Sequence, residues 1–126
     1  MRVMDRQEVG RLGEKLAQRF LKRRGYRVRE TNFHCREGEI DIVAQQRDCL
    51  VFIEVRTRSS LDFGTPEESI TRAKKERLIA SALTYIDTHQ NLPSSWRIDV
   101  VAIEVDDKGK AKRIELIENA IEQQYY

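Results

Sequence analysis

The sequence contains no apolar run long enough to cross a membrane, and its first ten residues lack the apolar middle of a secretory signal. It has only two cysteines, Cys35 and Cys49, and their spacing matches no metal-binding motif, so we expect reduced structural thiols. Internal repeats and low-complexity segments are also missing. These absences predict a cytoplasmic protein with no membrane partner. A length of 126 residues fits one domain, residues 1–126.

Charge, by contrast, is abundant, and it is unevenly distributed along the chain. The first 36 residues carry eleven Lys and Arg against four Asp and Glu, a net +7, while the other ninety residues sum to −5. A basic lobe beside an acidic remainder suits a polyanionic partner such as nucleic acid. Basic helix faces also occur for solubility alone, so the charge pattern leaves both interpretations open.

Hydrophobic periodicity predicts seven elements in the order α-β-β-β-α-β-β. Apolar residues recur every three or four positions over about 5–24, which indicates an amphipathic helix. A second helix is predicted to begin at "TPEES", where Thr65 and Glu68 form a capping box, and to run to about Thr88. Strands are expected near 26–33, 38–45, 49–57, 96–105 and 111–117. This order predicts an α/β or α+β layer structure with a mixed sheet.

Two charged residues, Asp41 and Glu54, lie inside the otherwise apolar second and third strands. If residues 47 and 48 form the loop of the hairpin, Asp41 lies directly across from Glu54 on the same face of the sheet. Regular alternation along the second strand then puts Ile40 and Ile42 together on the opposite face.

Opposed carboxylates repel each other, so a positive charge is expected between them. One candidate is Arg56, two residues along the same strand face, which would make an ion network. The other is a divalent cation, because paired carboxylate oxygens suit Mg²⁺ or Mn²⁺. The residues alone leave the choice open.

Five segments of the chain, in order, resemble the YraN family of small bacterial proteins: "GRLGEKLAQRFLKRRGY", "TNFHCREGEIDIVAQ", "LVFIEVRTR", "FGTPEESITRAKKERLIASALTYI" and "WRIDVVAIE". That family is presumed to be endonucleases of the restriction-endonuclease-like superfamily, with the motif PD-(D/E)xK, and is distantly similar to archaeal Holliday-junction resolvases. The resemblance implies the corresponding α/β fold, a mixed sheet flanked by helices.

The resemblance also implies roles for particular residues. Asp41 in "GEIDIVA" and Glu54 in "FIEVR" would be the metal-binding carboxylates, and the backbone carbonyl of Val55 would complete the site. Glu14 in "GRLGEK" is similar to the helix-borne acid that reaches the same centre in resolvase-like members. It is equally an ordinary charge at the boundary of the helix's apolar stripe.

One position departs from the motif, because Arg56 stands where the family typically has Lys. Arginine cannot give up its proton as a buried lysine can, so Arg56 would act only electrostatically. Lys74 could reach the site from the second helix, or it could belong to a solvated basic helix face. Arg58 is a candidate phosphate contact. So are the basic residues of the second predicted helix, Arg72, Lys75 and Arg77.

We therefore expect an endonuclease dependent on Mg²⁺ or Mn²⁺ that acts on nucleic acid, DNA rather than RNA, with branched or structured DNA as a candidate substrate. Its expected catalytic residues are Asp41, Glu54, Arg56, Glu14 and Lys74. The alternatives are a nucleic-acid-binding module with this fold and no cleavage, and an adaptor protein in which the charges are only an ion network. Paired cuts on a two-fold substrate would require a homodimer, which an unpaired edge strand could support.

Overall fold

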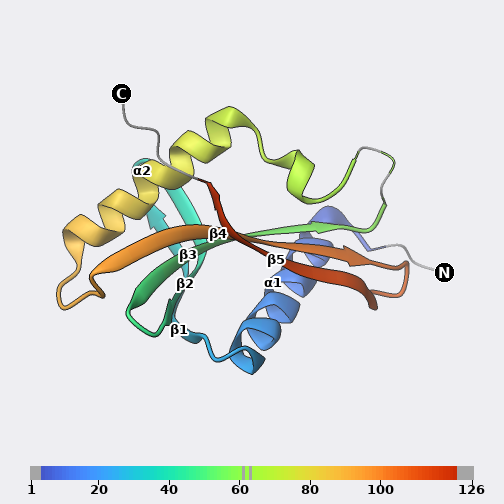
Figure 1. Ribbon diagram of the computed structural model, residues 1–126. Coiled ribbons are helices and arrows are strands. Elements are labelled where there is room, and N and C mark those ends of the chain that lie inside the picture. The colour runs from blue at the N-terminus through green and yellow to red at the C-terminus, as the bar shows by residue number, and fades with distance from the viewer. Residues whose placement is uncertain (1–3, 61, 63, 122–126) are drawn as a thin grey trace.

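The structure is a computed structural model that describes residues 4–60, 62 and 64–121. The elements are α1 (Arg6–Arg23), β1 (Arg27–Cys35), β2 (Gly38–Gln46), β3 (Cys49–Arg58), the short 3₁₀ helix η1 (Glu67–Ser69), α2 (Arg72–Thr88), β4 (Ser95–Val105) and β5 (Ala111–Ile121). Figure 1 shows α1 and α2 on opposite sides of the sheet. The predicted α/β class and the order α-β-β-β-α-β-β are confirmed.

The five strands form one sheet in the order β1-β2-β3-β4-β5. All neighbours are antiparallel except β3 and β4, which are parallel and are joined by the crossover through η1 and α2. Because both faces of the sheet are covered by helices, the central strands are apolar on both sides. One core cluster packs under α1 and includes Val51 and Ile53, and the other packs under α2 and includes Leu50 and Phe52.

Helix α1 lies close against β3 because of a glycine. Asp5 caps the helix by accepting a 2.8 Å hydrogen bond from the backbone N–H of Glu8. The helix ends before Gly25, whose φ of +86° favours glycine. Gly13 faces Thr57, and a Cβ built at Gly13 would lie 1.8 Å from the Thr57 Oγ1 atom. A larger residue at position 13 would therefore hold the helix away from the sheet.

The single helix predicted from Thr65 to Thr88 is wrong, because the chain forms two separate helical segments there. Thr65 and Glu68 do interact as a capping box, but it starts only η1. Ile70 is extended, with ψ of 109°, and Thr71 caps α2 by accepting a 3.1 Å hydrogen bond from the Lys74 N–H. The sequence has no Gly or Pro at the break, so its periodicity gave no warning.

Strand β5 holds η1 in place. Arg113 donates to both carboxylate oxygens of Glu67, at 3.1 and 2.8 Å, and to Glu104 at 2.8 Å. The hydrogen bonds from Arg113 lower the pKa of Glu67 to about 2. This contact ties the segment between β3 and α2 to the far side of the sheet.

The predicted hairpin register is confirmed from the pair Gln46–Cys49 to the pair Ile42–Ile53, with Arg47 in the left-handed conformation (φ 54°) in the turn. The predicted alternation fails at the next residue. Ile40 packs in the cluster under α2, whereas Ile42 packs under α1. Asn32 on β1 has a φ of 53° and no ladder partner between the pairs Phe33–Ile40 and Thr31–Ile42. Both strands therefore lose their regular pleat beside Asp41.

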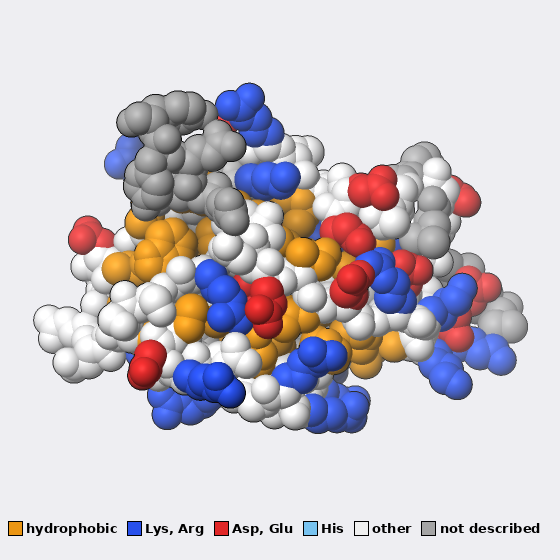
Figure 2. Space-filling model, in the orientation of Figure 1, with side chains coloured by type: hydrophobic (Ala, Val, Ile, Leu, Met, Phe, Trp, Pro, Cys, Tyr) orange, Lys and Arg blue, Asp and Glu red, His pale blue; other side chains and the backbone are white. Residues whose placement is uncertain are grey.

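Basic side chains gather along the lower edge of the face in Figure 2, over α1 and β1, as the charge pattern of the first 36 residues predicts. Acidic and basic side chains alternate over β5 at the right of the same view. Within the described part of the chain, neither helix has both the length and the apolar character needed to span a membrane.

Candidate functional site

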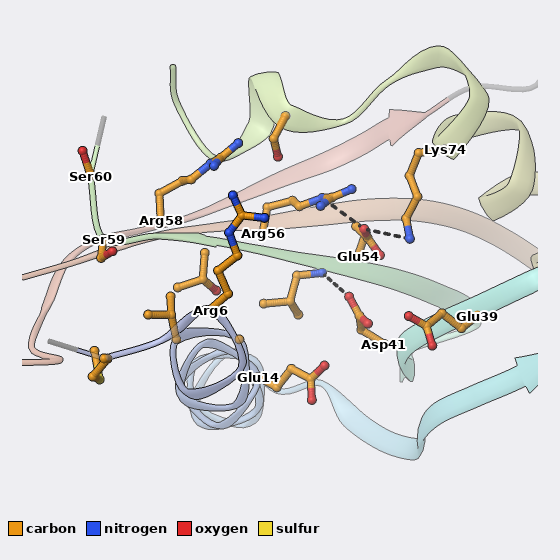
Figure 3. A pocket seen from close by; sticks show the side chains of 16 residues that line it. Arg6, Glu14, Glu39, Asp41, Glu54, Arg56, Arg58, Ser59, Ser60 and Lys74 are labelled. Carbon is orange, nitrogen blue, oxygen red and sulfur yellow. Dashed lines mark hydrogen bonds and ion pairs between the residues drawn. The ribbon is translucent and has the colours of Figure 1, made fainter. Parts of the chain in front are cut away.

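An open cavity of about 670 Å³ lies beside the place where the pleat is lost (Figure 3). Its walls come from α1, β2, β3, the segment after β3 and the first turn of α2. Since α1 and α2 cover opposite faces of the sheet, the cavity reaches both faces past the edge of β3. It exists because β2 stops pairing with β3 after Ile42, which leaves a gap between the two strands.

Asp41 lies at this gap, and its side chain replaces the backbone partner that Val55 of β3 would otherwise have on β2. Its Oδ2 atom accepts a 2.8 Å hydrogen bond from the backbone N–H of Val55. The N–H and C=O of one residue in an extended strand point to the same side, so the Val55 carbonyl also faces the gap. No Lys or Arg in the described residues forms an ion pair with Asp41. One carboxylate and one backbone carbonyl thus open onto the cavity together.

Glu54 is the buried acid of the site, with only 3% of its surface exposed. Its Oε2 atom lies 3.1 Å from the Arg56 Nε atom and 3.7 Å from the Lys74 Nζ atom. The Arg56 contact is an ion pair whose angle does not make a hydrogen bond, and the Glu54 Oε1 atom has no hydrogen-bond partner. Burial and, after it, the charge of Asp41 raise the pKa of Glu54 to about 8, although Lys74 and Arg56 oppose the shift. The two basic side chains therefore only partly compensate the buried acid.

Glu14 continues the acidic half of the cavity from α1. Figure 3 shows its side chain extending from the helix on the Asp41 side of the cavity. Burial raises its pKa, and the charges of Asp41 and Glu39 raise it further. Four carboxylates, those of Glu14, Glu39, Asp41 and Glu54, therefore line one cavity, and the charge of Asp41 disfavours the ionisation of both Glu14 and Glu54.

A hard divalent cation would relieve this repulsion, and the donors that face the gap are of the right chemical type. They are the Asp41 carboxylate, the unpartnered Oε1 of Glu54 and the Val55 carbonyl, all oxygens. Across residues 4–60, 62 and 64–121, no group of three or more His, Cys, Asp or Glu side chains is placed to hold a metal ion. A cation here would thus depend on two carboxylates and a backbone oxygen, with Glu14 farther out.

The structure brings together most of the residues that the sequence pointed to. Arg56 and Lys74 both lie against Glu54, so Lys74 reaches the acid and is not part of a solvated helix face. Arg58 lines the cavity as well. Three predicted phosphate contacts do not line it and are exposed on α2 instead: Arg72, Lys75 and Arg77.

Arg6 and Ser69 are among the cavity residues that sequence reasoning missed. Arg6 begins α1, and Ser69 ends η1, so each is far in sequence from the two carboxylates. Nothing in the local pattern distinguishes Arg6 from the other arginines of α1. Only the packing of the helix against the sheet brings it to the cavity.

Fold and site together define an α/β protein whose mixed sheet opens between two strands beside a pair of carboxylates, Asp41 and the buried Glu54. The model of the family described as "Uncharacterised protein family UPF0102" matches residues 13–103. A UPF0102 protein of Roseiflexus castenholzii is 49% identical over 120 residues, which is 94% of this chain and 96% of that protein. A UPF0102 protein of Dehalococcoides mccartyi is 47% identical over 117 residues, covering 93% and 95% of the two chains. The chain belongs to the UPF0102 family, the YraN family.

Proposed function

We propose that this protein is an endonuclease, dependent on Mg²⁺ or Mn²⁺, that hydrolyses phosphodiester bonds of DNA, branched or otherwise structured. The observation that carries the proposal is the acid pair at the gap, where Asp41 replaces a ladder bond and Glu54 keeps a buried oxygen without a partner. A purely structural ion network does not account for the unpartnered Glu54 Oε1, because an unsatisfied buried oxygen costs stability. The resemblance to restriction-endonuclease-like proteins supports the same role.

Each residue of the site has a distinct part in this proposal. The Val55 N–H orients the Asp41 carboxylate, and burial orients that of Glu54, so both oxygens are fixed before a substrate arrives. A divalent cation bound there would supply an activated water and polarise the phosphate. Arg56 and Lys74 would stabilise charge that develops on the phosphoryl oxygens, and Glu14 would serve as an accessory acid.

Cleavage of a labelled four-way DNA junction in Mn²⁺ tests the proposal, with wild type compared to Asp41→Asn. We expect wild type to cut and Asp41→Asn to lose at least about 100-fold in rate, since its amide oxygen is a weaker ligand for a hard cation. Asp48→Asn, the same change at an exposed hairpin residue, is the matched control and should cut like wild type. Equal cutting by wild type and Asp41→Asn would refute the proposed site.

The second candidate function is a binding module with no cleavage. It is favoured by the contacts of Arg56 and Lys74, because two cations already approach Glu54 where a metal would bind. In that case the wild-type protein retains the junction without cutting it, and Asp41→Asn binds with unchanged affinity. A band-shift experiment run beside the cleavage assay separates the two functions.

A further inference from the structure

The cavity is divided by charge into two halves. Carboxylates line the half toward β2, and guanidinium groups line the half toward the end of β3. Figure 3 shows Arg6, Arg56 and Arg58 converging on one region, although they come from α1 and β3. Arg56 joins the halves, because it alone of these three arginines forms an ion pair with Glu54.

In the described part of the chain, the other two arginines have no carboxylate partner. Among the described residues, no carboxylate forms an ion pair with Arg6 or Arg58, and no acceptor takes a hydrogen bond from either. Converging like charges repel each other, and a guanidinium in a partly enclosed site gains from a bidentate acceptor. The Ser59 hydroxyl group lines the same cavity and adds one hydrogen-bond donor. This combination is the chemistry that binds a phosphate group.

We propose that Arg6 and Arg58 form a subsite for a second phosphate of a nucleic-acid strand, next to the phosphate at the acid pair. This inference rests on the proposed function, because it takes the strand to run along the cavity from the carboxylates to the arginines. The subsite adds an anion site that the acid pair cannot provide. Together with the acid pair, it defines the line along which the strand lies in the cavity, with Arg56 between the two phosphates.

The exposed basic residues of α2 make a different contribution. Arg72, Lys75 and Arg77 lie outside the cavity, where phosphate contacts are dispersed and exchange readily with salt. Arg6 is exposed as well and Arg58 is half-buried, but these two arginines line one cavity and would grip one phosphate. Loss of either should therefore remove the same contact, which is a testable difference.

The test is the affinity of a fluorescent single-stranded DNA measured by anisotropy in EDTA, where metal-dependent cleavage does not contribute. Wild type, Arg6→Gln, Arg58→Gln and the double variant are compared across a range of salt concentrations. Arg11→Gln, an exposed arginine on the same helix outside the cavity, is the matched control. Arg58→Lys keeps the charge, and thermal unfolding of every variant checks that it is folded.

We expect each single variant to bind about tenfold more weakly, since a charge-assisted hydrogen bond is lost. The slope of log affinity against log salt should decrease by roughly 0.7, which corresponds to one phosphate on a single strand. The double variant should lose no more slope than either single variant, and Arg58→Lys should recover part of the affinity.

Three results would overturn the subsite: wild type that does not bind DNA, variants that match Arg11→Gln, or slope losses that add in the double variant. Removing the 5′-phosphate of the DNA identifies the source of the bound group. If wild type still binds this DNA more tightly than Arg6→Gln does, the bound group is an internal phosphodiester. If the difference in affinity disappears, the bound group is the terminal phosphate monoester. If wild type does not cleave DNA but still binds it more tightly than the Arg6→Gln and Arg58→Gln variants do, the proposed catalytic function is refuted and the phosphate subsite is not.

Discussion

Substitution of Gly13 tests how strongly the geometry of the site depends on the close packing of α1 against β3. In Gly13→Ala the new Cβ would lie 1.8 Å from Thr57 Oγ1, 2.8 Å from Thr57 Cβ and 3.1 Å from Thr57 Cγ2. Rotating the Thr57 side chain moves the first and third atoms but not the second, because Cβ is fixed to the backbone. The helix must therefore retreat from β3 by several tenths of an ångström.

A matched variant isolates the cost of this retreat. Gly10 is on the same helix, and a Cβ there meets nothing within 4 Å. Both substitutions gain roughly 0.5–1 kcal/mol of helix propensity. Because this gain is the same in both variants, the clash with Thr57 is the difference between them. The free energy of unfolding of Gly13→Ala should therefore be lower than that of Gly10→Ala by about 1–3 kcal/mol, the cost of overpacking.

Urea denaturation followed by circular dichroism measures both values, and the cleavage assay shows whether Glu14 and Arg6 have moved with the helix. We expect Gly13→Ala to cut more slowly and Gly10→Ala to be at least as stable as wild type. Adding Thr57→Ala to Gly13→Ala should recover only part of the loss, since the Thr57 Cβ contact remains. Equal stability of Gly10→Ala and Gly13→Ala would refute the close approach of α1 to β3.

Two further predictions concern the buried acid. Because the pKa of Glu54 is raised to about 8, the folded chain keeps a proton that the unfolded chain loses, so wild-type stability in EDTA should fall as pH rises from about 4.5 to 8. Urea denaturation at pH 5 and pH 8 measures the free energy of unfolding. The loss of this free energy between the two pH values should be smaller in Glu54→Gln than in wild type by about 1 kcal/mol or more, and should be unchanged in the exposed control Glu76→Gln. The same loss in wild type and Glu54→Gln would contradict the raised pKa. If Arg56 acts by its charge, Arg56→Lys should cleave within about tenfold of wild type while Arg56→Gln loses about 100-fold, and equal rates for the two variants would exclude that role.

The fold and the acid pair could be predicted because they depend on neighbours in sequence. Asp41 and Glu54 are thirteen residues apart on one hairpin, and a two-residue loop fixes its register as far as the pair Ile42–Ile53. The direct pairing of Asp41 with Glu54 that regular alternation predicts is not among the ladder pairs of the described residues, because Asp41 accepts a hydrogen bond from the Val55 N–H instead. Periodicity likewise located α1 within one residue at each end. In both cases, short-range geometry determines which side chains come together.

The features that could not be predicted depend on packing between distant segments. The alternation of β2 breaks between Ile40 and Ile42 because Asp41 turns into the gap and bonds to β3, an event invisible to a pattern of apolar residues. The break at Ile70 accompanies the Arg113–Glu67 contact, whose partners are 46 residues apart. Arg6 reaches the cavity only because Gly13 lets the helix lie close to the sheet.

The parallel pairing of β3 with β4 has a consequence for the order of events in folding. The β2–β3 hairpin is local and can form within microseconds, which brings the two carboxylates together. Their cationic neighbour Lys74 arrives only when α2 has packed on the sheet, and the core under α2 also includes Ile98 and Val100 of β4, whose residues begin at Ser95. A growing chain therefore carries the two acids well before the core under α2 is complete. The long crossover delays that core until most of the protein has been made.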